Sequence, residues 1–142
     1  HTAGKTKTDL WNNLPEQDHF LESMAEAAKA VTTHCGENIL YISVMNRLSV
    51  DCDCDSNPEE PKMADIGMLA SLDPVALDKA CADMVINAPI IGGNKLAETH
   101  PHEHLEGEDK FHLIHPDTNW QAGLRYAEEI GLGSQAYELI TV

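Results

Sequence analysis

The sequence predicts an α/β domain: a small mixed sheet of about three strands, packed by three helices and joined by long loops. Three observations predict this class. Helical apolar spacing occurs in three stretches, short β-branched apolar runs lie between and after them, and segments with Pro and Gly separate the two kinds of pattern. The 142 residues are enough for a single domain, 1–142, with a modest core.

The first helix is expected after a polar lead, residues 1–14, which we interpret as flexible. Pro15 suits the first turn of a helix, and Gly36 suits its end. Between them an apolar stripe recurs at helical spacing: Phe20, Met24, Ala27, Ala28, Val31 and Cys35. This spacing predicts an amphipathic helix with a buried stripe that ends at Cys35.

Two strands and a second helix are predicted next. Apolar runs over 38–45 and 64–71 indicate the strands, and the first of them is apolar almost throughout, which is typical of a strand covered on both faces. Asp73 and Pro74 then suit the N-cap and first position of a helix. Cys81 shares the apolar face of this helix, so we interpret it as a small core residue.

The last third of the chain begins with a long His-rich loop, residues 89–116, with a helical turn expected near "EDKFHLIH". Asp117 suits the N-cap of a third helix that ends at Gly131. The final stretch, "QAYELITV", predicts a closing strand.

Composition excludes several classes of partner. Nine basic against 24 acidic side chains give a formal charge of −15, which disfavours nucleic acid and anionic membrane as partners. No apolar run approaches the roughly 20 residues that span a bilayer. Four cysteines without an export signal indicate reduced thiols and a cytoplasmic protein.

The stretch "SVDCDCDSNPEEP", residues 49–61, carries the pattern that most favours chemistry. Cys52 and Cys54 lie one residue apart, and two such thiolates can bind a zinc or iron ion if two more ligands come from elsewhere. The alternating carboxylates also resemble the start of a calcium loop, but Lys62 stands where a bidentate glutamate is needed. A solvated turn without metal is the remaining interpretation.

Histidines could complete such a site. The candidates are His100, His102 and His104 in "THPHEH", and His112 with His115, which would share a helical face at i, i+3. Histidines at alternating loop positions also bind metal adventitiously, so a plain surface role for "THPHEH" stays open.

Three strings resemble a known family: "DCDC", "ADIGMLASLDPVALDKACADMV" and "EDKFHLIHPDTNWQAGLRYAEEIGLGSQAYELITV". Over most of residues 38–142 the chain resembles the C-terminal part of the uncharacterised iron-sulfur-centre proteins, the family of domain of unknown function 362. The resemblance implies a longer parent protein with an upstream ferredoxin-like insert, whose thiolates would hold any iron-sulfur cluster. A chain that begins at His1 fits such a C-terminal fragment. The residues that match the motif are Cys52, Cys54, Asp65, Asp73, Asp78, His115 and Asp117.

We therefore expect the C-terminal domain of an iron-sulfur protein, with a metal-binding or electron-transfer role through the C-x-C loop. One alternative is a structural or docking domain without its own chemistry. Another is part of a metal-dependent enzyme site that the upstream region and His115 complete. The expected partners are the upstream half of the same parent and a redox partner, and a homo-oligomer is a further candidate.

Overall fold

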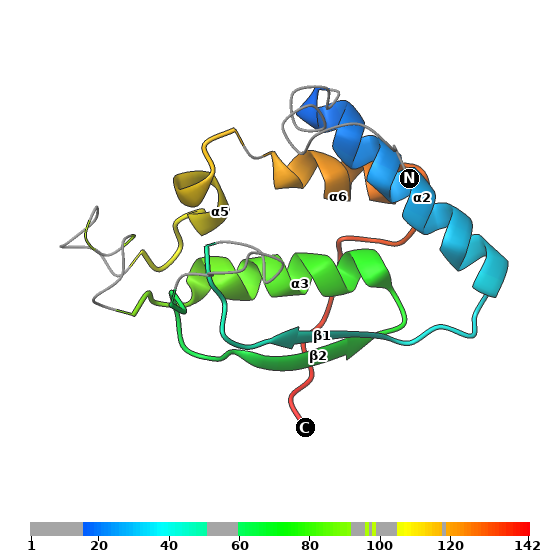
Figure 1. The fold of residues 1–142 in the computed structure, drawn as a ribbon. Helices are drawn as coiled ribbons and strands as arrows, with labels where there is room; N and C mark the ends of the chain where they lie inside the picture. The colour runs from blue at the N-terminus through cyan, green and yellow to red at the C-terminus, as the bar shows by residue number, and fades with distance from the viewer. Residues whose placement is uncertain (1–15, 51–59, 92–95, 97, 99–104, 118) are drawn as a thin grey trace, which may run out of the picture.

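A computed structural model describes residues 16–50, 60–91, 96, 98, 105–117 and 119–142. Its elements follow the order α2 (Gln17–Cys35), β1 (Tyr41–Met45), β2 (Gly67–Ser71), α3 (Pro74–Asn87), α5 (Lys110–Ile114) and α6 (Trp120–Glu129). Helix α3 lies between the sheet on one side and the packed pair α2 and α6 on the other (Figure 1). The α/β class is therefore confirmed.

The sheet is smaller than predicted and it is antiparallel. Strands β1 and β2 form a two-stranded ladder in which Tyr41 is paired with Ser71 and Met45 with Gly67. The predicted closing strand over 135–142 is wrong, since these residues form no ladder. Instead the hydroxyl group of Tyr137 donates a hydrogen bond to Asp83 Oδ2 on α3, at 2.9 Å, so a side-chain contact holds this segment where backbone pairing was expected.

The sheet is also covered differently from the prediction. On β1, Tyr41 and Ser43 are half-buried and Met45 is buried, whereas Ile42 and Val44 are 60% and 55% exposed. Helix α3 packs on both strands and covers one face of the sheet. Apolar side chains therefore occupy both faces of β1, but only one face is buried among the residues that the structure describes.

Helix α3 forms as the sequence predicts. The Asp73 carboxylate accepts hydrogen bonds from the backbone N–H groups of Val75 and Ala76 at 2.9 and 3.0 Å, and Pro74 occupies the first helical position. The buried residues of the helix are Val75, Ala76, Leu77, Ala80, Ala82 and Val85. This one helix thus supplies six of the fourteen buried apolar residues in the described part of the chain.

Helix α2 ends at Gly36 as predicted, but its predicted buried stripe is wrong. Met24 and Val31 are 54% and 62% exposed, and Cys35 is exposed. The buried residue is Ala25, which forms a core cluster with Val75 and Ala127. The reason is the direction from which α6 packs: Tyr126 donates to Glu26 Oε1 at 2.9 Å, and Lys29 donates to the carbonyl oxygen of Gly131.

Helix α6 begins two residues later than predicted. Asn119, and not Asp117, is the N-cap. The backbone N–H of Asn119 donates to Gln17 Oε1, and its side-chain amide donates to Asp18 Oδ1, both at 2.7 Å. The first turn of α2 therefore fixes the start of α6. The two contacts join residues that are 102 and 101 positions apart, so local sequence signals could not predict them.

The predicted helical turn in the His-rich loop is confirmed as α5, with Asp109 as its N-cap. Lys110 is 1% exposed, and its ammonium group donates to the carbonyl oxygens of Ile86 and Leu105, each at 2.5 Å. Beside it lies a second apolar cluster of Ile90, Leu96 and Leu105, with Leu113 and Ile114 packed against it. Within the described part of the chain, no helix is both long and apolar enough to cross a bilayer.

Candidate functional site

Four of the predicted metal ligands, Cys52, Cys54, His102 and His104, lie outside the described residues, as does His100. The residues that flank the C-x-C segment are described, and they are joined to each other. The backbone N–H of Lys62 donates to the carbonyl oxygen of Leu48 at 2.7 Å, and that of Ile66 donates to Met45 at 2.9 Å. The described residues on either side of the segment that carries both cysteines thus meet at the end of the β1–β2 ladder.

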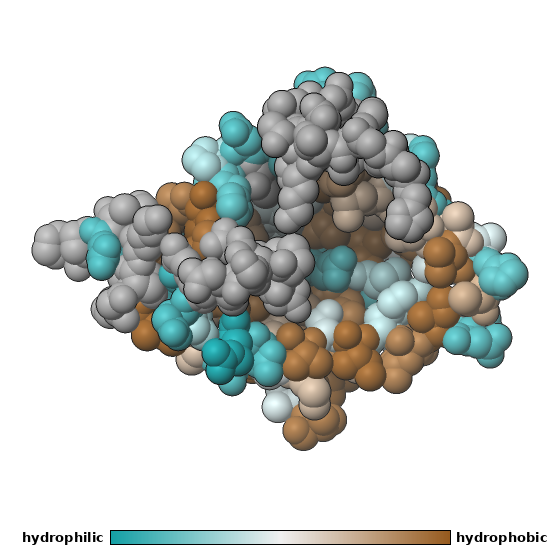
Figure 2. Space-filling model, in the orientation of Figure 1, coloured by the Kyte–Doolittle hydropathy of each residue, from teal (hydrophilic) through white to brown (hydrophobic). Residues whose placement is uncertain are grey.

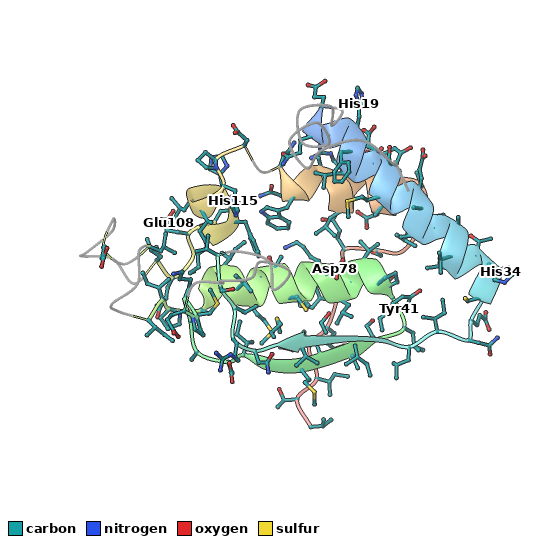
Figure 3. The ribbon with its side chains drawn as sticks, viewed as in Figure 1. His19, His34, Tyr41, Asp78, Glu108 and His115 are labelled. Carbon is teal, nitrogen blue, oxygen red and sulfur yellow. The ribbon has the colours of Figure 1, made fainter. Side chains whose placement is uncertain are left out.

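The other two predicted ligands, His112 and His115, are both exposed. His112 lies within α5, and His115 is its C-cap, with non-helical φ and ψ of −127° and 88° (Figure 3). Among the residues described by the structure, no group of three or more His, Cys, Asp or Glu side chains could hold a metal ion. These two histidines remain predicted ligands that would need partners from elsewhere.

A cleft of about 640 Å³ lies between α3 and the pair α2 and α6. Figure 2 shows a hollow with brown, apolar surface along its lower and right-hand rim and paler and teal residues within it. Its walls include Leu21, Ala28, Met45, Val75, Ala82, Val85, Phe111, Trp120, Leu124 and Leu132. Leu48 also lines the cleft. Because Leu48 accepts the hydrogen bond from Lys62, the residues that flank the C-x-C segment lie next to the cleft.

Among the described residues, three polar side chains line this cleft: Ser43 from β1, and Asp78 and Cys81 from α3. Asp78 is on the side of α3 that faces α2 and α6 (Figure 3). Solvent reaches Asp78, yet the surrounding cleft wall desolvates it enough to raise the pKa of its carboxyl group. Burial also raises the pKa of the Cys81 thiol, which is hydrogen-bonded to Ser43 and lies near the Asp78 charge.

Cys81 was predicted to be a core residue, but it is only half-buried and lines the cleft. Asp78 matched the family motif, but no site role was predicted for it. A signal was present, because Val75, Asp78, Ala82 and Val85 recur at helical spacing and all line the cleft. One carboxylate within an otherwise apolar helical face marks such a site.

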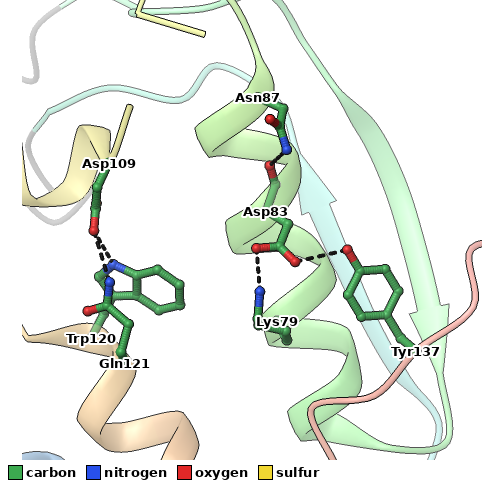
Figure 4. Close-up of polar contacts among 7 residues, drawn as sticks. All are labelled: Lys79, Asp83, Asn87, Asp109, Trp120, Gln121 and Tyr137. Carbon is green, nitrogen blue, oxygen red and sulfur yellow. Dashed lines mark hydrogen bonds and ion pairs between the residues drawn. The ribbon is translucent and has the colours of Figure 1, made fainter. Parts of the chain in front are cut away.

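An aromatic pair forms another part of the cleft wall. The rings of Phe111 and Trp120 have centroids 5.8 Å apart and planes inclined by 56°. Asp109 fixes the indole, since its Oδ2 accepts from Trp120 Nε1 at 2.9 Å and from Gln121 Nε2 at 3.0 Å (Figure 4). Burial would raise the pKa of Asp109, but the hydrogen bonds from Trp120, His112 and Gln121 hold it below its ordinary value.

The outer face of the sheet is a second notable surface. In register, Ile42 is paired with Ala70 and Val44 with Met68, on the face opposite the inward-directed Ser43. Met68 is 73% exposed, and Leu40 and Leu72 at the strand ends are 60% and 76% exposed. We call these six residues the outer sheet face.

Comparison with known proteins gives the class of this α/β domain. The family model for "Domain of unknown function (DUF362)" matches residues 1–83, which is more than half of the 142. The chain belongs to this family. The match includes "DCDC" and ends within α3, so His112, His115 and the C-terminal string lie beyond it. No curated protein and no solved structure gives a significant match.

Proposed function

We propose that this domain has a metal-binding or redox role in which Cys52 and Cys54 ligate or transfer a zinc or iron ion. The observation that carries the proposal is the C-x-C pair, which lies between aspartates in the sequence. The backbone hydrogen bond from Lys62 to Leu48 joins the residues on either side of this segment. Because this hydrogen bond joins the residues on either side of the segment, we expect a lower entropic cost of bringing both thiolates to one ion. The family match, which includes this segment, supports its relevance to the family.

The state of the other cysteines supports a reducing compartment. Cys35 and Cys81 are free thiols. Unpaired thiols are typical of cytoplasmic proteins, where a C-x-C pair is available for metal. In this proposal an iron-sulfur cluster is carried by an upstream region of a longer parent protein, and the C-x-C loop exchanges metal or electrons with it.

Metal content per chain tests the proposal. Protein expressed under anaerobic conditions should carry near-stoichiometric zinc or iron, measured by elemental analysis, and Cys52→Ser with Cys54→Ser should remove it. Cys35→Ser is the matched control, because it removes an exposed thiol at the end of α2 and should leave the metal content unchanged. Equal metal content in the double variant and the wild type would exclude these cysteines as ligands. Metal-free wild-type chain would exclude an independent site in this domain.

A docking role is a second candidate, and the outer sheet face favours it. Contiguous exposed apolar side chains on a sheet are typical of surfaces that another polypeptide covers. The candidate partner is the upstream part of the same parent protein. The isolated domain should then bind a hydrophobic dye and self-associate, and Ile42→Thr with Met68→Thr should reduce both. Val31→Thr, an exposed apolar change on α2, is the control. A monomer without dye binding would contradict the docking role.

A further inference from the structure

The cleft between α3 and the α2–α6 pair has the size and lining of a small-molecule site. At about 640 Å³ it falls within the range of ligand pockets, and most of its lining is apolar. Apolar lining alone does not select a ligand, because any apolar group would gain by entering. Selection must come from the polar groups in the wall.

Of the described polar side chains in the wall, Asp78 is the one without a partner. Cys81 and Ser43 are hydrogen-bonded to each other. The two other aspartates of this helical region are also occupied: Asp73 caps α3, and Asp83 is paired with Lys79 and accepts from Tyr137 (Figure 4). Asp78, by contrast, has neither a cation nor a hydrogen-bond donor beside it within the described part of the chain.

Asp78 is exposed to solvent, and the apolar wall beside it desolvates the carboxylate in part. The apolar wall disfavours the charged form, which is why burial raises the pKa of Asp78. A cation that enters the cleft would restore the interaction that water no longer supplies in full. An anion would meet the Asp78 charge and a chain of net charge −15, so it is disfavoured.

The aromatic pair favours the same class of ligand. The faces of aromatic rings attract ammonium groups as well as apolar groups. The Trp120 indole has its N–H engaged by Asp109, so the ring contributes apolar and π surface to the cleft and no free donor. Phe111 adds a second ring beside it.

We propose that this cleft binds a small organic cation, an amine with an apolar body, whose ammonium group pairs with Asp78 and whose body lies between α3 and the α2–α6 pair. This site goes beyond the metal-binding role and does not depend on it. We infer a cation because its charge complements the unpaired Asp78 carboxylate, and an apolar body because the rest of the described wall is mostly apolar.

Three probes of equal length test the proposal: 4-phenylbutylamine, 4-phenylbutanol and 4-phenylbutyrate. Their binding to the full chain is measured by calorimetry and by chemical-shift perturbation in heteronuclear NMR spectra. The amine should bind about tenfold more tightly than the alcohol, because it can form a charged hydrogen bond to the Asp78 carboxylate, and the acid should bind most weakly. The shifts should include residues of α3 and Trp120.

Asp78→Asn keeps the shape of the side chain and removes its charge, so the amine should lose about tenfold in affinity and its preference over the alcohol. Asp83→Asn is the matched control: it changes an aspartate of the same helix that does not line the cleft, and it should leave the preference intact. An amine that binds no better than the alcohol would overturn the proposal. So would a preference that survives in Asp78→Asn. Equal binding of all three probes would indicate a purely apolar groove, the kind that an apolar side chain of another polypeptide fills.

Discussion

The Asp73 carboxylate joins the start of α3 to Ser134, which lies 61 residues later in the chain. Its Oδ2 accepts a hydrogen bond from the backbone N–H of Ser134 at 2.8 Å, while its Oδ1 caps α3. The residue before Ser134 is Gly133, and a Cβ atom added there would lie 2.0 Å from Asp73 Oδ1. The close approach of the two segments therefore requires glycine for steric reasons.

Gly133→Ala should destabilise the protein by about 1–2 kcal/mol, because the carboxylate must move and the helix cap weakens. The measurement is the free energy of unfolding in urea. Asp73→Ala alone should cost a similar amount. If the two effects share this contact, Gly133→Ala should cost much less in the Asp73→Ala background, and additive effects would contradict the mechanism.

Gly123→Ala should have the opposite sign. Gly123 lies within α6, and an added Cβ would meet Leu21 Cβ at 3.5 Å, an ordinary contact. Alanine in a helix interior is favoured over glycine by about 0.5–1 kcal/mol, so the variant should be more stable by that amount. Chemical denaturation measures it, and a loss of stability would show that α2 and α6 have no room for a methyl group.

Lys110→Met should destabilise the domain by about 2 kcal/mol. The substitution removes both hydrogen bonds from the buried ammonium group and leaves the carbonyl oxygens of Ile86 and Leu105 without that donor. Lys29→Met is the control, since the hydrogen bond from Lys29 to a carbonyl oxygen is exposed to solvent, and it should cost about 0.5 kcal/mol or less. Equal effects would mean that burial of Lys110 adds nothing.

The pH dependence of the free energy of unfolding should show that the ionised Asp78 carboxylate destabilises the folded state. Because burial raises the pKa of Asp78 in the folded state, the folded protein binds this proton more tightly than the unfolded chain. The contribution of Asp78 to stability therefore falls as the pH rises from its pKa in the unfolded chain through its higher pKa in the folded protein. Asp78→Asn should therefore be more stable than the wild type at pH 7, with a difference that shrinks towards pH 4 and below, as urea titrations across this range can measure.

Asp109→Asn gives the matched comparison with reversed sign. Hydrogen bonds hold the pKa of Asp109 below its ordinary value in spite of the opposing effect of burial, so its carboxylate stabilises the folded state above the unfolded pKa. That contribution is lost as pH falls through the lowered folded value. The variant should be less stable than the wild type at pH 7, and a stabilising effect there would contradict the assigned hydrogen bonds.

Local sequence signals predicted α3 almost completely. Asp73 and Pro74 set its start by chemistry that acts within one helical turn, and the turn near "EDKFHLIH" likewise formed as α5. The family was also recognisable, because "DCDC" and the "DIG-LAS-DPVALD" pattern are properties of the sequence itself. The C-x-C pair, Cys52 and Cys54, is likewise visible in the sequence alone.

The tertiary structure decided what lies far apart in sequence. Helix α6 buries Ala25 and leaves Met24 and Val31 exposed, because the face that a helix buries depends on its neighbour as well as on its apolar stripe. The closing segment forms no strand, since its propensity could be realised only with a ladder partner. The cleft around Asp78 arises in the same way: the sequence supplied a carboxylate on an apolar helical face, and only the packing of α2, α5 and α6 opposite α3 enclosed it.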